Sequence, residues 1–460
     1  MRLSPSRALS RVLSRVLSGV ALFAISGVLL SGCAKTDRQE ASGKGVLVAI
    51  NAIVDAPDVA FRIEERSLGA VAFGNATPVN RYDDLTYIFN YDAPQAGTSE
   101  FTRLASRQLK VERDIFYLFA LGGSLASPQI FLWEDAVRQW ADTDTVFELA
   151  FANLSNDLGA VDVYFAAPGI APALGNAIAT LAYGERLATA EFAAGDYELI
   201  ITPQGDTQTL LYTSGTRTFN AASSDTIVLF DADPSRNGNA TVRLVGRAGT
   251  SVDIGDPRFA PTMTVLHAAI EIGNVDVAEN GNFTNLIVSN LAFAEQGVNP
   301  QLTPGLNSYE FTETGNQGAS LAEEELNVTS GSNYRLTLVG PASSPDVLAA
   351  PNLRRPFATS GRISAQHAAA AISIVDIYLL ETGASLDDNI PFFGFVPFKA
   401  SAPLSSVKAG SYEVTVTPGG EKTAIAGPVA LDISNGQVVE LYILETADPN
   451  VADIRIERFP

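Results

Sequence analysis

Four copies of one pattern fill most of this chain, and they restrict it to a tandem series of similar folds. Each copy contains an aspartate beside apolar β-branched or aromatic residues, then a tyrosine at a strand-like start, and later an apolar run. The aspartates are Asp58, Asp162, Asp276 and Asp376, and the tyrosines are Tyr87, Tyr197, Tyr309 and Tyr412. The period of roughly 100 residues is well above that of solenoid repeats, so each copy is expected to fold as its own unit.

Alternation of apolar and polar residues identifies the elements within each copy as strands. Tyr412, Val414 and Val416 share one face of their segment, while polar residues occupy the other face. A period of two with β-branched and aromatic residues is typical of strands. Turn-forming segments recur between the strands, as at 203–205 and 418–420. Short strands and frequent turns predict an all-β fold of tandem immunoglobulin-like antiparallel β-sandwiches.

The spacing of the landmarks predicts four sandwich domains joined by linkers. Their predicted ranges are 45–140, 141–250, 260–345 and 360–460. Helix is expected only as a turn or two within Glu134–Ala141 and Ala171–Thr180. Linkers are predicted at Ala34–Lys44, Ala248–Pro261 and Pro341–Gly361, of which the last is rich in Pro, Ser and Ala.

The amino-terminal segment has the pattern of an export signal. Four arginines and no acid precede a mostly apolar run at Val16–Leu30, which is followed by Ser31, Gly32 and Cys33. This order is typical of a secretory signal peptide, and the run is too short for a transmembrane helix. Leu-Ser-Gly-Cys also resembles the lipobox of bacterial lipoproteins. That resemblance implies a signal peptide at 1–32, a lipidated Cys33 and a tether at 33–44. An ordinary secretory cleavage site or an uncleaved anchor is the alternative.

Charge and cysteine content limit the partners and the compartment. Ala34 rather than Asp follows Cys33, and the resemblance to sorting rules of Gram-negative lipoproteins then implies the outer membrane. Loss of residues 1–32 removes four arginines and no acid, which leaves a formal net charge of −25. Such an acidic chain is not expected to bind nucleic acid or to dock onto anionic membrane surfaces, so its membrane contact is expected through the lipid. Because Cys33 is the only cysteine, no disulfide can form within the chain.

The third and fourth copies resemble a bacterial family called domain of unknown function four-three-nine-seven. The resemblance is carried by a strand ending in His267 or His367, a following Val-Asp-Val or Val-Asp-Ile-Tyr segment, and the later tyrosine-containing strand start. The first copy departs from this pattern, since it lacks the histidine, and the second has Asn153 at that position. The family implies an exported, sandwich-like module that often occurs in tandem and often carries a lipid anchor. It implies no activity.

The two histidines are the first candidates for a chemical site. His267 and His367 each precede their aspartate by nine residues. They could form a metal half-site or a catalytic pair, or they could bond backbone groups in a turn. Zinc needs three or four protein ligands, and neither copy offers a second His or Cys, so no metal site is predicted. The repeated aspartates could form a shared ligand site, or they could be solvated acids that discourage edge-to-edge strand pairing.

A loop at 231–239 carries alternate oxygen-bearing residues, which suit calcium. It lacks the EF-hand glycine at the sixth position and the glutamate at the twelfth, and it could equally be a hairpin turn. Gly-x-Ser-x-Gly, His-Glu-x-x-His and dinucleotide-binding patterns are missing, and Glu421 replaces the required glycine of a phosphate loop. The chain is therefore predicted to be non-enzymatic and to hold no cofactor.

These observations together predict a lipid-anchored protein of the bacterial cell envelope. Its expected function is that of a non-catalytic binding or adhesion module for a protein or glycan. The alternative function is a periplasm-facing structural scaffold for envelope assembly.

Overall fold

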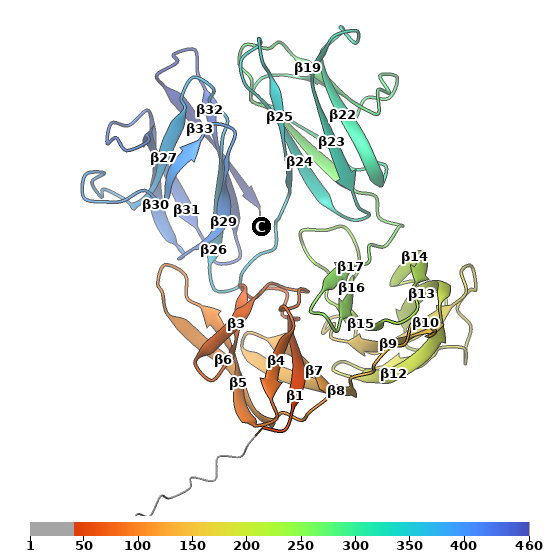
Figure 1. The fold of residues 1–460 in the computed structure, drawn as a ribbon. Helices are drawn as coiled ribbons and strands as arrows, with labels where there is room; N and C mark the ends of the chain where they lie inside the picture. The colour runs from red at the N-terminus through yellow and green to blue at the C-terminus, as the bar shows by residue number, and fades with distance from the viewer. Residues whose placement is uncertain (1–40, 460) are drawn as a thin grey trace, which may run out of the picture. The chain divides into compact units, whose positions relative to one another are not determined.

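A computed structural model describes residues 41–459 of the chain, which form strands and connecting loops (Figure 1). The predicted signal peptide at 1–32, Cys33 and most of the tether lie outside the described residues. The described part contains strands β1 to β33 and no helix, which confirms the all-β prediction. The expected helical turns are absent, since Glu134 lies in a strand that ends at Ala136 and Ala179–Leu181 forms another.

Repeat 1 is built from eight strands in two sheets. Its strands are β1 (Lys44–Asn51), β2 (Val59–Ile63), β3 (Arg66–Val71), β4 (Asn80–Asp83), β5 (Thr86–Pro94), β6 (Phe101–Lys110), β7 (Ile115–Ser124) and β8 (Ser127–Ala136). One sheet has the order β4-β1-β7-β8, and the other has the order β3-β2-β5-β6.

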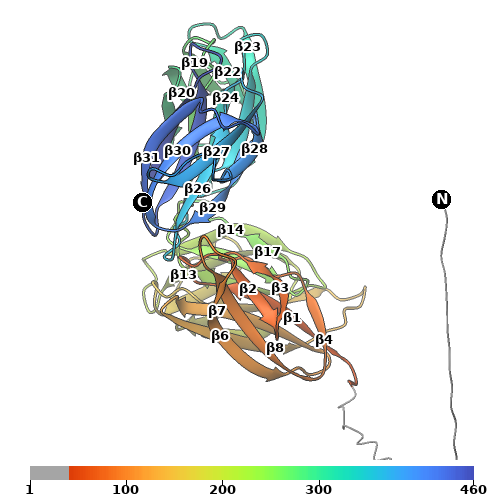
Figure 2. The ribbon, with the colours of Figure 1, turned by 90° about the vertical axis from the view of Figure 1, so that its left-hand side faces the viewer.

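Repeats 2, 3 and 4 follow the same strand order, and Figure 2 shows many of their strands from another side. Repeat 2 consists of β9 (Val146–Asn153), β10 (Val161–Ala166), β11 (Ala179–Leu181), β12 (Arg186–Ala193), β13 (Gly195–Pro203), β14 (Tyr212–Phe219), β15 (Ser224–Phe230), β16 (Thr241–Gly246) and β17 (Ser251–Asp253). Repeat 3 consists of β18 (Thr262–His267), β19 (Val275–Glu279), β20 (Val288–Leu291), β21 (Gln296–Asn299), β22 (Gly305–Glu313), β23 (Ser320–Val328), β24 (Asn333–Val339) and β25 (Asp346–Pro351). Repeat 4 consists of β26 (Gly361–His367), β27 (Ile374–Glu381), β28 (Phe393–Pro397), β29 (Ser401–Val407), β30 (Gly410–Pro418), β31 (Ala426–Ile433), β32 (Val438–Glu445) and β33 (Ala452–Phe459).

Two of the predicted linkers contain strands. The stretch Ala248–Pro261 includes β17, which extends the sheet of repeat 2 by pairing with β16. The stretch Pro341–Gly361 includes β25, which pairs with β24 along its full length. β17 has only three residues, and β25 does not alternate, since four apolar residues follow one another at 347–350. The periodicity signal for a strand was therefore weak in both places.

One sheet of each repeat contains a parallel strand pair, which the sequence did not predict. The first strand of the repeat pairs in parallel with the seventh, as β1 does with β7 and β26 with β32. All other pairs in the two sheets are antiparallel. We call the sheet with the parallel pair the mixed sheet and the other one the antiparallel sheet. Parallel pairing needs a long crossover, and in repeat 1 the crossover consists of the four strands of the antiparallel sheet together with β4.

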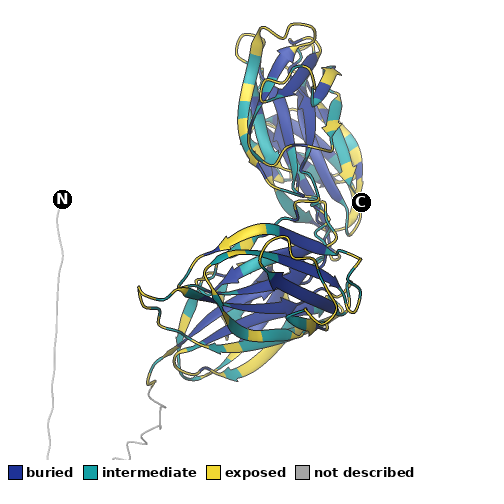
Figure 3. Cartoon of the chain, turned by 90° about the vertical axis from the view of Figure 1, so that its right-hand side faces the viewer, coloured by how far each residue is buried: buried dark blue, intermediate teal, exposed yellow. Residues whose placement is uncertain are grey.

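Each repeat has its own apolar core between its two sheets, shown in dark blue in Figure 3. In repeat 4, Val414 and Val416 of the antiparallel sheet are fully buried against Val439 and Leu441 of the mixed sheet. The apolar face predicted from alternation is thus the core face of β30. Burial of a side chain of this size contributes about 1.5–3 kcal/mol, so each core is the main source of stability for its repeat.

The mixed sheets are buried on both faces because repeats share additional apolar clusters. One cluster joins Val48 and Leu118 of repeat 1 to Val228 and Phe230 of repeat 2. A smaller one joins repeat 3 to repeat 4. Strands covered on both faces read as continuous apolar runs, and β7 is buried from its second to its eighth residue. Repeat 1 therefore packs against repeat 2, and repeat 3 against repeat 4, although each repeat has its own core. Every strand and every cluster lies in the compact unit Ala41–Pro460.

Candidate functional site

The two histidines close turns at the ends of strands. His267 ends β18, His367 ends β26, and both side chains are fully buried. The Ala369 N–H donates a hydrogen bond to Nδ1 of His367 at 3.4 Å, so Nε2 carries the proton and donates to the Ile372 carbonyl at 2.8 Å. His267 makes the same two kinds of contact with the backbone of its own turn. Since both ring nitrogens are used, neither ring has one free for a metal.

Asparagine takes over this role in the first two repeats. Asn51 ends β1 and Asn153 ends β9, at the positions equivalent to the histidines. The side-chain oxygen of each accepts a hydrogen bond at 3.0 Å from the backbone N–H two residues later. The position therefore requires a buried hydrogen-bond acceptor, which explains why histidine and asparagine replace one another between repeats.

Acid is expected to destabilise the chain through these histidines. Burial lowers the pKa of His367 to about 4, below the 6.5 of an exposed histidine. The unfolded state therefore binds more protons between these two values, and stability falls as the pH drops from about 6.5 towards 4. From pH 7 to pH 5 this group should cost about 2 kcal/mol. Urea unfolding of His367→Asn, which copies repeats 1 and 2, should show a pH dependence smaller by that amount. An unchanged slope would contradict the assignment.

The repeated aspartates hold two turns together at one end of the antiparallel sheet. The buried Asp376 carboxylate accepts hydrogen bonds from the backbone N–H of Phe395 at 2.6 Å and of Gly420 at 2.8 Å. Asp162 and Asp276 make the equivalent contacts with the donors Thr180, Gly205, Asn290 and Thr314. The interpretation as solvated acids is wrong, because these carboxylates are buried and satisfy nearby donors. Each serves its own repeat, so they form no shared ligand site.

Asp58 does not belong to this set. In repeat 2, Asp162 lies opposite Thr202, whereas the residue in the same register of repeat 1 is Ala60, opposite Asp92. Asp58 precedes β2, and its carboxylate contacts the Arg355 guanidinium at 3.3 Å. The residue of the first copy that is equivalent to Asp162 is therefore Ala60, two residues after Asp58. Asp58 is a half-exposed ion-pair partner rather than a turn-holding residue.

The acidic loop at 231–239 is occupied by contacts within the chain. The Asp231 carboxylate accepts hydrogen bonds from the Ser155 hydroxyl at 2.7 Å and from the Asp157 N–H at 3.0 Å. The Asn237 N–H donates to the Gly331 carbonyl at 2.7 Å, which fixes the loop against repeat 3. Among residues 41–459, no group of three or more His, Cys, Asp or Glu side chains is placed to hold a metal. The hairpin alternative therefore describes this loop.

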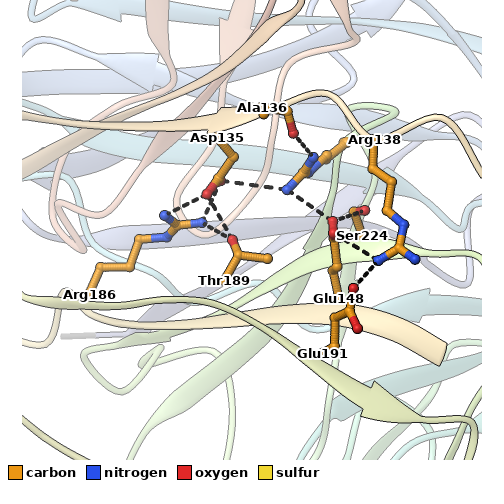
Figure 4. Close-up of polar contacts among 9 residues, drawn as sticks. Asp135, Ala136, Arg138, Glu148, Arg186, Thr189, Glu191 and Ser224 are labelled. Carbon is orange, nitrogen blue, oxygen red and sulfur yellow. Dashed lines mark hydrogen bonds and ion pairs between the residues drawn. The ribbon is translucent and has the colours of Figure 1, made fainter.

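A cluster of charged side chains between repeats 1 and 2 contains more connected ion pairs than any other group among the described residues (Figure 4). Three arginines and four acids make up this arginine cluster, namely Asp135, Arg138, Asp144, Glu148, Arg186, Glu191 and Arg247. Arg186 contacts both oxygens of Asp135, at 2.6 and 3.2 Å. Arg138 contacts Glu148 at 3.2 Å and Glu191 at 2.5 Å. Such paired geometry fixes the side chains.

The surroundings shift the pKa values of the central members. Burial alone would raise the pKa of Asp135, but the Arg186 guanidinium, together with Thr189 and Arg247, outweighs it and holds the pKa below its usual value. Burial lowers the pKa of Arg247, and the nearby Asp135 and Glu148 oppose that effect. Because four acids face three arginines, the cluster carries no surplus positive charge. It is therefore not suited to capture an anion.

A cavity of about 300 Å³ opens beside this cluster. The Trp140 ring lines it, and the Arg138 guanidinium lies 4.0 Å from the ring centroid, which holds the ring in place. Ser223, Ser224, Asp225 and Thr250 line the cavity as well, together with Arg138 and Arg247 of the cluster. The Ser224 hydroxyl donates a hydrogen bond to the Glu148 carboxylate at 2.8 Å. Burial raises the pKa of Asp225, although Ser223 and Arg247 oppose the shift. The cavity thus combines an aromatic surface with hydroxyl and carboxylate groups.

No pattern in the sequence predicts this cavity. Its residues come from three separate stretches, around 137–140, 223–225 and 246–250, that only the fold brings together. The sequence contains one indication of it, namely Trp140. This residue is one of only two tryptophans, and it lies two residues after Arg138 in a stretch without strand alternation. That stretch was interpreted as a possible helical turn.

Within residues 41–459, no helix is long and apolar enough to cross a bilayer.

Comparisons with known proteins place one part of the chain in a family. The chain is similar to the TIE protein of Bacillus anthracis (9% identity, 88% of this chain and 68% of that one, TM-score 0.16). It is also similar to CBMbc, a family CBM26 module of Eubacterium rectale Amy13K solved with maltoheptaose (14%, 45% and 96%, TM-score 0.17). The third structure is the pneumococcal glycogen-degrading virulence factor SpuA (7%, 83% and 38%, TM-score 0.15). TM-scores this low establish no common function, and no curated protein matches the chain. Residues 261–378, which cover repeat 3 and the start of repeat 4, match the family described as Domain of unknown function (DUF4397), and this confirms a DUF4397-like domain there.

Proposed function

We propose that this chain is a lipid-anchored, non-catalytic binding module of the bacterial cell envelope, and that the cavity beside Trp140 binds a neutral glycan. The lipid anchor is Cys33, and the outer membrane is its expected location. The cavity carries the proposal, since it combines an aromatic ring, a carboxylate and three hydroxyl groups in about 300 Å³, at the lower end of the range for ligand sites.

The chemistry of the cavity favours a saccharide over other small ligands. The C–H face of a sugar ring is apolar and packs on an aromatic ring, while its hydroxyl groups donate to carboxylates and exchange hydrogen bonds with serine and threonine. Trp140 and Asp225 supply the first two of these partners. Arg138 and Arg247 also line the cavity, but both are ion-paired with acids of the arginine cluster. Because this pairing neutralises their charge, a neutral glycan fits better than an anionic one.

Substitution of Trp140 tests this function directly. Trp140→Ala is expected to weaken binding to neutral oligosaccharides by roughly thirtyfold, because buried aromatic anchors at binding sites are worth about 2 kcal/mol or more. The measurement is a titration with an array of neutral and acidic oligosaccharides. The chain has only two tryptophans, so Trp133→Phe makes Trp140 the single reporter, and its fluorescence should change as the sugar binds.

The Trp133→Phe variant is also the matched control, since it changes the other tryptophan and should bind sugars as the unmodified chain does. Equal binding by Trp140→Ala would remove the cavity from the proposal. A preference for acidic sugars that survives this substitution would place the glycan site elsewhere.

The contacts between repeats favour a second function, a periplasm-facing scaffold. The shared apolar clusters and the arginine cluster fix repeats against one another, as a structural spacer would require. Protease added to intact cells separates the two functions. A scaffold inside the periplasm stays protected, whereas an exposed binding module is cleaved.

A further inference from the structure

We propose that the end of repeat 4 around Phe395 is a docking surface for a protein segment that is both apolar and basic. This surface lies on a different repeat from the Trp140 cavity, and it is independent of the proposed glycan binding. Its apolar side chains, its backbone geometry and its charge each contribute to the argument.

Four large apolar side chains are exposed on β27, β28 and the loop between them, and two of them, Ile374 and Phe395, lie within 3.5 Å of a Cβ atom added to Gly419. Ile390 is 87% exposed, Phe395 67%, Ile374 40% and Phe392 39%. Ile374 begins β27, Ile390 and Phe392 lie in the loop that leads into β28, and Phe395 lies within β28. A Cβ atom added to Gly420 would lie 3.8 Å from the Phe395 ring, so the ring lies over the turn after β30. Exposed apolar groups gathered in one place are typical of interaction sites, whereas scattered ones are not.

The backbone holds Phe395 outward in a conformation that a bulky residue rarely adopts. Its φ angle is +54°, and it lies in a β-bulge opposite Asp376. The equivalent bulge residue of repeat 3 is Asn290, with φ +51°, and asparagine tolerates this region well. The hydrogen bond from the Phe395 N–H to the buried Asp376 carboxylate stabilises the bulge. A bulky residue held in this way is common where a side chain is directed towards a partner.

The charges around the surface are negative. Asp387, Asp388 and Glu421 are exposed on the same loop and turn. The nearby ammonium group of Lys422 donates hydrogen bonds to the carbonyls of Leu386 at 2.6 Å and Asn389 at 2.5 Å, and these bonds fix the loop. An apolar partner with flanking lysines or arginines complements this rim. An anionic lipid surface is repelled by it.

A pair of synthetic peptides tests the proposal on the compact unit Ala41–Pro460. A fluorescent peptide of alternating leucine and lysine should bind, and a leucine–glutamate peptide of the same length should not. Phe395→Asn should weaken binding of the first peptide by about tenfold or more. The same variant should raise the midpoint of thermal unfolding, because asparagine accepts the positive φ angle. A midpoint that does not fall shows that binding is lost because the Phe395 side chain is missing, and not because the variant unfolds.

Two further variants and a vesicle arm complete the test. The double variant Asp387→Asn, Asp388→Asn should weaken binding and reduce its salt dependence, while Phe101→Ala, an exposed phenylalanine of repeat 1, should leave binding unchanged. Equal peptide binding by Phe395→Asn overturns the proposal. Binding to neutral phosphatidylcholine vesicles that disappears in Phe395→Asn overturns it as well, because the surface would then be a lipid contact.

Discussion

Glu440→Ala is expected to destabilise the chain by about 3–5 kcal/mol, since it removes one partner of a buried ion pair. The Arg335 guanidinium of repeat 3 bonds the Glu440 carboxylate of repeat 4 and, at 3.1 Å, the Tyr442 hydroxyl. Arg335 and Glu440 are each 6% exposed. Burial alone would lower the pKa of Arg335, but Tyr442 and Glu440 raise it above its usual value. Without Glu440, a buried positive charge remains unpaired between repeats 3 and 4.

Urea unfolding followed by circular dichroism measures this loss. The double variant Arg335→Met, Glu440→Leu should recover most of it, since apolar residues of similar size often replace buried ion pairs at little cost. Asp83→Ala is the surface control, because its pair with Lys44 spans 3.6 Å and both side chains are about half exposed. That control should cost about 0–1 kcal/mol. A Glu440→Ala effect as small as this would mean that water reaches the Arg335 guanidinium.

Cys33→Ser is expected to move the protein from the membrane fraction to the soluble fraction almost completely. Each methylene of an acyl chain contributes about 0.8 kcal/mol to membrane binding, so removal of the proposed acyl chains should lower the affinity by many orders of magnitude. A hydroxyl group at this position cannot form the thioether. Ultracentrifugation of cell envelopes and labelling with an azide-bearing fatty acid would both report the change.

The residue after the cysteine provides a matched variant. Ala34→Asp should keep the lipid label, but it should retain the protein in the inner membrane if the Gram-negative sorting rule applies. A Cys33→Ser protein that stays in the membrane pellet after carbonate washing would show that residues 1–32 act as an uncleaved anchor.

The strands were predictable because alternation is a local property. The apolar side of β30 follows directly from Tyr412, Val414 and Val416, and turn-forming segments separate the strands. Pairing between strands far apart in sequence was not predictable in this way. The parallel pair of β1 and β7 depends on how two sheets close on each other, which no local pattern records.

The contact between repeats is reflected in the sequence as long apolar runs, which an alternation pattern does not explain. The runs in β7 and β32 are apolar at nearly every position, although a strand with one solvated face would alternate. Such runs indicate burial on both faces, first by the core of the repeat itself and then by its neighbour. The sequence alone does not show that a neighbouring repeat covers the outer face of each of these strands.

The candidate residues taken from the repeated pattern make structural contacts, because repetition selects what every fold unit needs. His267, His367 and the aspartates of repeats 2, 3 and 4 hold turns that each repeat must close. The Trp140 cavity and the Phe395 surface occur once each, so a search for shared landmarks passes over them. Features that break a repeat are the better guide to function in a chain of this kind.

The eighth strand of repeats 1, 3 and 4 decides where the chain leaves each of them. Phe116 of β7 lies between Val46 near the start of β1 and Asp135 near the end of β8, so the polypeptide enters and leaves repeat 1 at the same end. The registers of β26 and β33 on β32 give repeat 4 the same property. A seven-stranded sandwich would release the chain at the opposite end. In repeat 2, the additional strand β17 runs back along β16, so the chain leaves that repeat at the end opposite to its entry, and this one strand changes the direction in which the series of modules continues.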